Sequence, residues 1–165
     1  MITRPIPGLD IQGSALALGT WAVGGEGWGG SERAEDIRAI RAALDEGINF
    51  IDTAPIYGFG LCEEIVAEAI AGRRDEVILA TKCGLRWNVA VGEFSFEDGA
   101  GNRIHRALSP ESIREELEDS LRRLKVEHID LYQTHWQTPS TAIEDTMAEL
   151  EKQKQAGKIR AIGIS

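Results

Sequence analysis

The 165-residue sequence predicts an α/β fold built on a parallel β-sheet. Three observations lead to this prediction. Short runs rich in aliphatic and β-branched residues alternate with segments whose apolar residues recur at the helical period. Most intervals between the runs are close to the roughly 30 residues of one strand–helix unit. The runs are also apolar, as expected of parallel strands, because their crossover helices cover the sheet. An open doubly wound sheet and a (β/α) barrel both satisfy these observations.

Five segments are predicted to form the strands. In chain order they are SALALGT (14–20), INFIDT (48–53), VILATK (77–82), IDLYQTH (129–135) and IRAIGIS (159–165). The third interval is longer than the others because it contains an excursion, residues 84–107, that is rich in Gly, Asp and aromatic residues. Ligand-facing loops follow strands in both candidate architectures, so we expect this excursion to lie near a binding site.

Four amphipathic helices are predicted between the strands. Ile37, Ile40 and Leu44 share one face of the first helix, which Gly47 ends, because glycine readily adopts the conformation that follows a helix. The second helix has a similar apolar face (residues 65, 66, 69 and 70) and ends at Gly72. We interpret these faces as the layer that covers the sheet.

The last two helices begin at recognisable caps. Ser109 is predicted to cap the third helix, with Pro110 at its first position. Thr141 and Glu144 form a capping-box pattern at the start of the fourth helix, which Gly157 ends. The apolar residues that follow each cap at helical spacing are interpreted as core residues and not as a binding surface.

The composition excludes several classes of function. The formal net charge is -9 and the isoelectric point is about 4.9, so nucleic acid and anionic membrane surfaces would be repelled. No apolar stretch approaches the ~20 residues of a membrane helix, and the first ten residues lack the apolar core of an export signal. We therefore expect a cytoplasmic protein with neither nucleic-acid nor membrane partners.

The two cysteines, Cys62 and Cys83, have the spacing of neither a disulfide framework nor a zinc site. They are predicted to be buried or half-buried free thiols. No metal site is expected.

A glycine pattern in the first long connection matches the dinucleotide-binding fingerprint formally. Gly25, Gly27 and Gly30 have its spacing, and Asp52 follows where a ribose-binding acid would lie. The fingerprint requires its first glycine at the turn that ends a strand, whereas the first predicted strand ends near Thr20. We therefore interpret the glycines as part of a loop and reject the dinucleotide-binding fold.

Polar side chains follow three neighbouring strands at their carboxyl ends. Asp52 ends the second strand with Tyr57 just beyond it, Lys82 ends the third, and His135 ends the fourth. Each residue alone has an ordinary structural explanation, such as a turn cap or a solvated strand end. Together they are expected to converge, because the carboxyl ends of parallel strands meet at one edge.

These four residue types suit proton delivery to a carbonyl oxygen. A free phenol is a poor acid at neutral pH, but a nearby ammonium favours the phenolate, so Lys82 would make Tyr57 a better donor. Asp52 would keep Lys82 charged in a semi-buried site. His135 would orient the substrate oxygen and donate a hydrogen bond as charge develops there.

Five blocks of the chain resemble, in order, blocks of the aldo-keto reductase family: LALGTWAVGG, GINFIDTAPIYG, VILATKCG, IDLYQTHW and GKIRAIGIS. The resemblance implies a (β/α)₈ barrel of the TIM type, of which residues 1–165 would form the first four βα units plus strand five as a single domain. It also implies an N-terminal β-hairpin, with Gly13 in its return turn, that closes the bottom of the barrel. The opening TWAVGG and the long third loop are most similar to the bacterial general-stress and sugar-aldehyde branch.

The resemblance also implies the chemistry. Asp52, Tyr57, Lys82 and His135 match the catalytic tetrad, which reduces an aldehyde or ketone with hydride from nicotinamide C4 and a proton from Tyr57. NADPH is the expected cofactor, with NADH as the alternative. The implied cofactor contacts are Gly19, Thr20, Trp21, Asp52 and Ser165. The implied walls of the substrate pocket are Trp21, Trp87 and Trp136.

The length departs from the family pattern, because a full barrel needs about 250 residues. We expect a fragment, a half barrel completed by a second copy, or an altered solitary fold. Open parallel edges would favour self-association. Two other functions stay open at this point: a fragment without turnover, and a cofactor-sensing regulatory module of the same fold.

Overall fold

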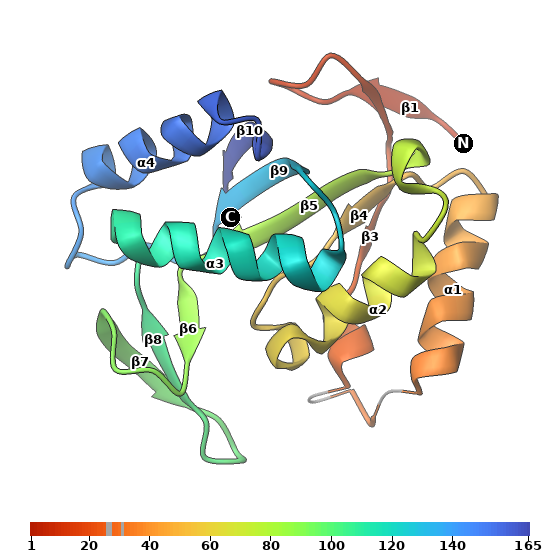
Figure 1. Ribbon diagram of the computed structural model, residues 1–165. Coiled ribbons are helices and arrows are strands. Elements are labelled where there is room, and N and C mark those ends of the chain that lie inside the picture. Colours follow the sequence, from red (N-terminus) through yellow and green to blue (C-terminus); the bar gives the residue numbers. More distant parts are fainter. Residues whose placement is uncertain (26–27, 31) are drawn as a thin grey trace.

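The computed structural model describes residues 1–25, 28–30 and 32–165. Its centre is a five-stranded parallel sheet in the order β10-β9-β5-β4-β3 (Figure 1). The strands are β3 (Ala17–Gly19), β4 (Phe50–Asp52), β5 (Ile78–Cys83), β9 (Ile129–Thr134) and β10 (Ile159–Ile164). Across this sheet the strands follow one another in chain order. A doubly wound sheet would reverse its order at a switch point, so the α/β prediction is confirmed and the winding is that of a barrel.

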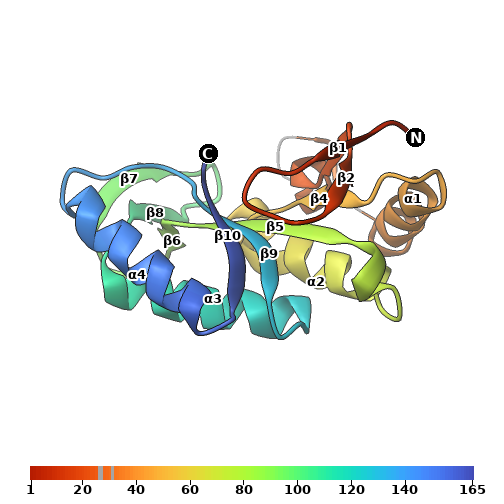
Figure 2. The ribbon, with the colours of Figure 1, turned by 90° about the horizontal axis from the view of Figure 1, so that it is seen from above.

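The helices form a layer over one face of the sheet. They are α1 (Arg33–Asp45), α2 (Leu61–Ala69), α3 (Pro110–Leu124) and α4 (Ile143–Gln155). Figure 2 shows α2, α3 and α4 together on one side of the strands, and α1 packs against α2. The core lies between the two layers and contains the fully buried side chains of Ile51, Leu79 and Tyr132 from the strands and Ile65 and Leu117 from the helices.

One of the two predicted helix caps is confirmed. The Ser109 hydroxyl accepts the Ser112 amide at 3.3 Å at the start of α3. The capping box at Thr141 is wrong, because α4 is capped by Ala142 and has no side-chain cap. The Thr146 hydroxyl donates to the carbonyl oxygens of Leu108 and Ala142, which anchors the first turn of α4 beyond Thr141.

A β-hairpin lies at the amino ends of the strands (Figure 1). It pairs β1 (Thr3–Pro5) with β2 (Gln12–Ser14), so the first predicted strand, 14–20, is divided between the hairpin and β3. The Ser14 amide donates to the side-chain oxygen of Asn49, just before β4, at 2.7 Å. The turn assigned to Gly13 is wrong: Gly13 lies within β2, where a Cβ would come within 2.7 Å of Ile6 Cδ1. Gly8, with φ at 81°, lies in the connection.

The predicted excursion is an ordered antiparallel sheet and not a loop. It consists of β6 (Leu85–Trp87), β7 (Glu93–Glu97) and β8 (Arg103–Arg106), in the order β6-β8-β7. In Figure 1 this extension projects from the carboxyl end of β5. The carbonyl of Gly84 accepts the Ala107 amide at 3.2 Å, which ties the entry of the extension to its exit.

Gly25, the first glycine of the fingerprint pattern, does not lie at the turn that ends a strand. Gly27 lies outside the described residues. Gly25 follows a short 3-10 helix, η1 (Trp21–Gly24), which begins only after β3 has ended. The position of Gly25 therefore agrees with rejecting the fingerprint.

Cys62 and Cys83 are free and buried, as predicted. Among the described residues, no helix has the length and apolar character needed to cross a membrane.

Candidate active site

Lys82 is the centre of a polar cluster at the carboxyl end of the sheet. Side chains alternate along β5, so Leu79 and Cys83 face the core under the helices and Lys82 faces the other side of the sheet. Lys82 is only 4% exposed, so its ammonium needs partners inside the protein. Its Nζ atom lies 2.8 Å from Asp52 Oδ2, 2.9 Å from the Thr53 carbonyl oxygen and 3.2 Å from Tyr57 Oη. The three ammonium protons thus have three acceptors.

Asp52 is the anionic partner of this cluster. It ends β4 and pairs in register with Gly19 on one side and Ala80 on the other. Its second oxygen, Oδ1, accepts the side-chain amide of Gln133 at 3.3 Å. The side chain is 33% exposed, so the ion pair with Lys82 lies at the mouth of the site and not in the deep core.

Tyr57 begins the 3-10 helix η2 (Tyr57–Gly60), and its position depends on two glycines. A Cβ at Gly24 would lie 2.8 Å from the backbone nitrogen of Gly58, so η1 and η2 approach more closely than any side chain at residue 24 would allow. This contact brings the Trp21 ring, from η1, over Tyr57 at 6.2 Å between centroids and 28° between planes. The phenol is thereby held between Trp21 and Lys82.

His135 follows β9, and its ring makes a T-shaped contact with the Tyr57 ring. The ring centroids are 5.8 Å apart at 85°, and the His135 amide donates to the Cys83 carbonyl at 2.8 Å. Burial, and then the Lys82 ammonium, lower the pKa of His135 from 6.5 to about 4, against a smaller opposing effect of Asp52. The imidazole is therefore neutral at neutral pH and can donate a hydrogen bond without carrying a charge.

The residues predicted to contact the cofactor differ in their exposure to solvent. Gly19 is exposed beside Asp52, and an added Cβ there would meet no atom within 4 Å. Ser165 follows β10 at the same edge, and its amide donates to the Thr134 carbonyl. Thr20 is fully buried, and both its amide and its hydroxyl donate to the Asp52 carbonyl. The amide and hydroxyl of Thr20 thus hold the end of β3 against β4.

The three predicted tryptophans do not form one wall. Trp21 is 58% exposed over Tyr57, and Trp136 contacts both His135, at 6.2 Å, and Phe96 of the extension, at 5.8 Å. Trp87 packs on Phe59 at 5.7 Å and has no ring contact with Tyr57 or His135 in the described part of the chain. The structure therefore brings two of the three tryptophans to the polar cluster.

Two contributors to the site were missed from the sequence. Gln133 binds Asp52, and its place two residues before His135 on an alternating strand was a usable signal. The Thr53 carbonyl accepts a hydrogen bond from Lys82, and because it is a backbone group, no pattern of residue types predicts it.

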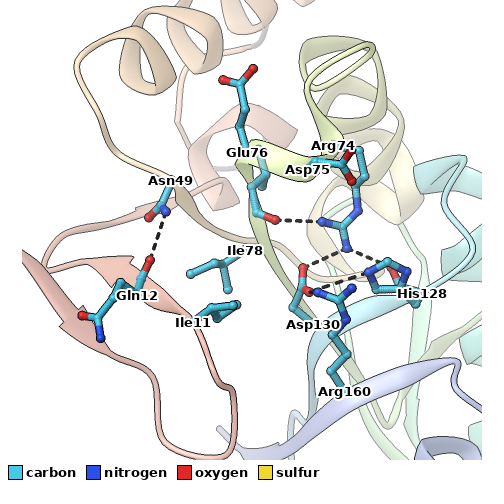
Figure 3. Close-up of a pocket in the computed structure, with 11 residues that line it drawn as sticks. Ile11, Gln12, Asn49, Arg74, Asp75, Glu76, Ile78, His128, Asp130 and Arg160 are labelled. Carbon is cyan, nitrogen blue, oxygen red and sulfur yellow. Dashed lines mark hydrogen bonds and ion pairs between the residues drawn. The ribbon is translucent and has the colours of Figure 1, made fainter.

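A cavity of about 380 Å³ lies at the other end of the strands, beside the hairpin (Figure 3). Its charged side chains mostly satisfy one another. Asp130 is 1% exposed and accepts Arg74 at 2.8 Å, Arg160 at 2.9 Å and the Leu79 amide at 2.9 Å. This cluster connects β5, β9 and β10 and contains none of the four polar residues predicted as a site.

Comparisons with known proteins agree with the fold and show the family. The model of the Aldo/keto reductase family matches residues 15–165. The aldo-keto reductase YhdN of Bacillus subtilis is 49% identical over 157 residues, which are 94% of this chain and 44% of the relative. The NADH-specific methylglyoxal reductase of Escherichia coli is 45% identical over 168 residues, which cover 98% of this chain and 51% of the relative.

Solved structures of aldo-keto reductases are also similar to this chain. The glycerol dehydrogenase AKR11B4 from Gluconobacter oxydans is similar with a TM-score of 0.84 and 50% identity, covering 98% of this chain and 47% of that one. The holo form of the aldo-keto reductase AKR11C1 from Bacillus halodurans is similar with a TM-score of 0.83 and 37% identity. The match covers 100% of this chain and 50% of that one. The chain thus spans about half the length of the relatives that it matches.

Proposed function

Because the chain belongs to the aldo/keto reductase family, we propose that its polar cluster reduces the carbonyl group of a small aldehyde or ketone to an alcohol. One observation carries the proposal. The Lys82 ammonium contacts both the Asp52 carboxylate and the Tyr57 phenol, beside a neutral His135. This arrangement supplies a proton donor, a charge that makes the donor more acidic, and a second hydrogen-bond donor for the substrate oxygen.

The residues at the mouth fit the nicotinamide end of a dinucleotide. Gly19 leaves open space beside Asp52, and a flat ring requires such space. The Asp52 carboxylate and Ser165 border the same edge of the sheet and would hold the ring with Gly19. When bound, the reduced nicotinamide supplies a hydride to the carbonyl carbon. We propose NADPH as the cofactor and NADH as the alternative, since one similar relative is named as NADH-specific.

The four polar residues would complete the reduction on the oxygen side. Once the carbonyl carbon had received the hydride, the carbonyl oxygen would hold the displaced π electron pair and would take the proton from Tyr57 Oη. His135 donates a hydrogen bond to the same oxygen and stays neutral. Lys82 stabilises the phenolate that remains, and Asp52 balances the charge of Lys82. Solvent then reprotonates Tyr57, so the net reaction consumes one hydride and one proton.

The substrate is proposed to be a short oxygenated carbonyl compound. Two similar proteins are named for methylglyoxal and glycerol, which are both three-carbon compounds. In this chain Trp21 and Trp136 offer apolar faces next to Tyr57 and His135, and such faces suit a small carbon skeleton whose oxygens reach the polar cluster.

Oxidation of NADPH and of NADH with a panel of two- to six-carbon aldehydes and ketones tests the proposal. The two tyrosines of the chain provide a matched pair. Tyr57→Phe is expected to lower kcat by about 10²- to 10⁴-fold, because it removes the proton donor. Tyr132→Phe removes the hydroxyl of a phenol buried in the helix-facing core, away from the polar cluster, and is expected to leave kcat nearly unchanged. Equal rates in the parent and Tyr57→Phe would refute the proton-donor role.

A second candidate is cofactor binding without turnover, as in a regulatory module or an incomplete barrel. It is favoured by one observation, which is that the chain covers about half of its relatives. Titration of nicotinamide fluorescence distinguishes the two candidates. Binding without oxidation of cofactor by any carbonyl in the panel would support the second candidate and count against the first.

A further inference from the structure

The peptide group between Cys83 and Gly84 is held from both sides. Its carbonyl oxygen accepts the backbone amide of His135 at 2.8 Å. Its N–H donates to Glu116 of α3, whose two carboxyl oxygens lie 3.0 and 3.2 Å from the Gly84 nitrogen. Lys82 immediately precedes this peptide. One rigid unit thus connects Glu116, on the helix layer, to the strand ends that carry Lys82 and His135.

No strand ladder supplies a partner to the Gly84 amide. The pairing of β5 with β9 ends at Cys83 opposite Thr134, and the chain then turns sharply into β6. At Gly84 φ is 102°, and a Cβ would lie 2.7 Å from Leu108 Cδ2, so both the turn and the close packing require glycine. A buried N–H at such a turn is costly unless a side chain accepts it. Glu116 is that acceptor.

The carboxyl group of Glu116 is buried away from solvent. It is 4% exposed, and burial raises its pKa to about 8. The Gly84 amide and the charges of Arg86 and Arg123 act in the opposite direction, and the charge of Glu63 raises the pKa further. Its other titratable neighbours are the Cys83 thiol and the Tyr132 phenol, whose pKa values burial also raises. Glu116 therefore changes charge within the pH range in which the protein can be studied.

We propose that Glu116 is a positioning residue, which sets the relative placement of Lys82 and His135 through the Cys83–Gly84 peptide. An ionised carboxylate accepts a hydrogen bond more strongly than a neutral carboxyl group, so ionisation draws the Gly84 N–H toward α3. The peptide carbonyl moves with it, and so does the His135 amide bound to that carbonyl. The importance of this movement for turnover rests on the proposed function, whereas the movement itself is a property of the protein alone.

Backbone NMR of the full ¹⁵N-labelled chain between pH 6 and 10 tests the inference without any cofactor. The Gly84 and His135 amide resonances are expected to shift together in one step with a midpoint near 8. Glu116→Gln keeps the shape and a hydrogen-bond acceptor but cannot ionise, so the step is expected to vanish from both resonances. Glu111→Gln, on the exposed first turn of the same helix, removes the same charge and is expected to leave the step in place.

Glu116→Leu provides a second measurement. It removes the acceptor, and we expect the Gly84 amide to exchange with solvent about tenfold faster or more. Should Glu116→Leu fail to fold, the Glu116→Gln titration alone decides the inference. A step that persists in Glu116→Gln, or that moves Gly84 and leaves His135 unmoved, would overturn it. A chain that titrates as expected but oxidises no NADPH or NADH would count against the proposed function and leave the positioning role standing.

Discussion

The Lys82 ammonium lies 3.2 Å from the phenol oxygen of Tyr57 and 4.9 Å from the centre of its ring. These residues come from different elements, because Lys82 belongs to β5 and Tyr57 begins η2. Their contact depends on the sheet register, which places the ends of β4 and β5 together, and on the glycine contact between η1 and η2.

Asp52→Asn is expected to destabilise the fold, because it leaves the buried Lys82 ammonium without its anionic partner. Asp52 is partly exposed, so we expect a loss of about 2 kcal/mol in the free energy of unfolding, less than for a fully buried pair. Urea denaturation measures it. Asp45→Asn, which breaks an exposed ion pair with Arg73, is the control and should cost less than about 0.5 kcal/mol. Similar losses in both variants would show that burial of Lys82 adds nothing to this pair.

His135 is expected to make stability depend on pH. Its pKa is lowered from 6.5 to about 4 in the folded chain, so between these values the unfolded chain binds more protons. The folded state therefore loses stability as pH falls from about 6.5 to about 4, and His135 contributes nothing to the slope above that window. Urea denaturation across this range should give a shallower fall for His135→Gln than for the parent. Parallel curves for the two chains would contradict the half-buried, neutral imidazole.

Gly24→Ala is expected to displace Tyr57, since the new methyl group would lie 2.8 Å from the Gly58 nitrogen. Overpacking against backbone typically costs about 1 to 3 kcal/mol, and the near-ultraviolet circular dichroism of the stacked Trp21 and Tyr57 rings should change. Gly99→Ala is a suitable control, because an added Cβ there meets no atom within 4 Å. If both variants kept the parent spectrum and stability, the close approach of η1 and η2 would not be needed.

Self-association through the open edge of the sheet is expected at high protein concentration. Within the described residues β10 pairs only with β9, and Ile164 on β10 is 65% exposed. An apolar groove adjoins it, lined by Gln137, Thr138, Pro139, Thr141, Ile143 and Ile164. Light scattering should detect dimers, and Ile164→Lys should shift them toward monomer because a charge protects an edge strand. Ile2→Lys, at another exposed apolar residue, should have no effect. A monomer at every concentration would refute this prediction.

The sheet and its helices could be predicted because period and composition are local properties of the sequence. The apolar run from 77 to 82 and the stripe of Ile113, Leu117 and Leu121 indicate β5 and α3 directly. The convergence of Asp52, Tyr57 and Lys82 could also be expected, because parallel strands share one carboxyl edge.

Other features depend on contacts that the sequence does not display. Thr141 matches a capping box, but α4 begins after Ala142, and its first turn is anchored by the hydrogen bond from Thr146 to the Leu108 carbonyl. Gly13 resembles a turn residue, yet its small size serves the packing of Ile6 within the hairpin. The strands of the 84–107 segment are short and flanked by glycines, which gives the segment a composition typical of loops. Their pairing therefore could not be predicted from composition.

The antiparallel extension enters and leaves the sheet at one point, where Gly84 and Ala107 are hydrogen-bonded to each other. Beyond this base, the extension contacts the rest of the chain through side chains, because Arg86 binds Glu115 of α3 and Trp87 packs on Phe59 of η2. Phe96 on the extension contacts Trp136 next to His135, so the residues beyond Arg86 and Trp87 bring variable side chains close to the polar cluster. If the proposed function holds, exchange of residues 88–102 between relatives would alter substrate selectivity while the contacts of Arg86 and Trp87 with α3 and η2 stay in place.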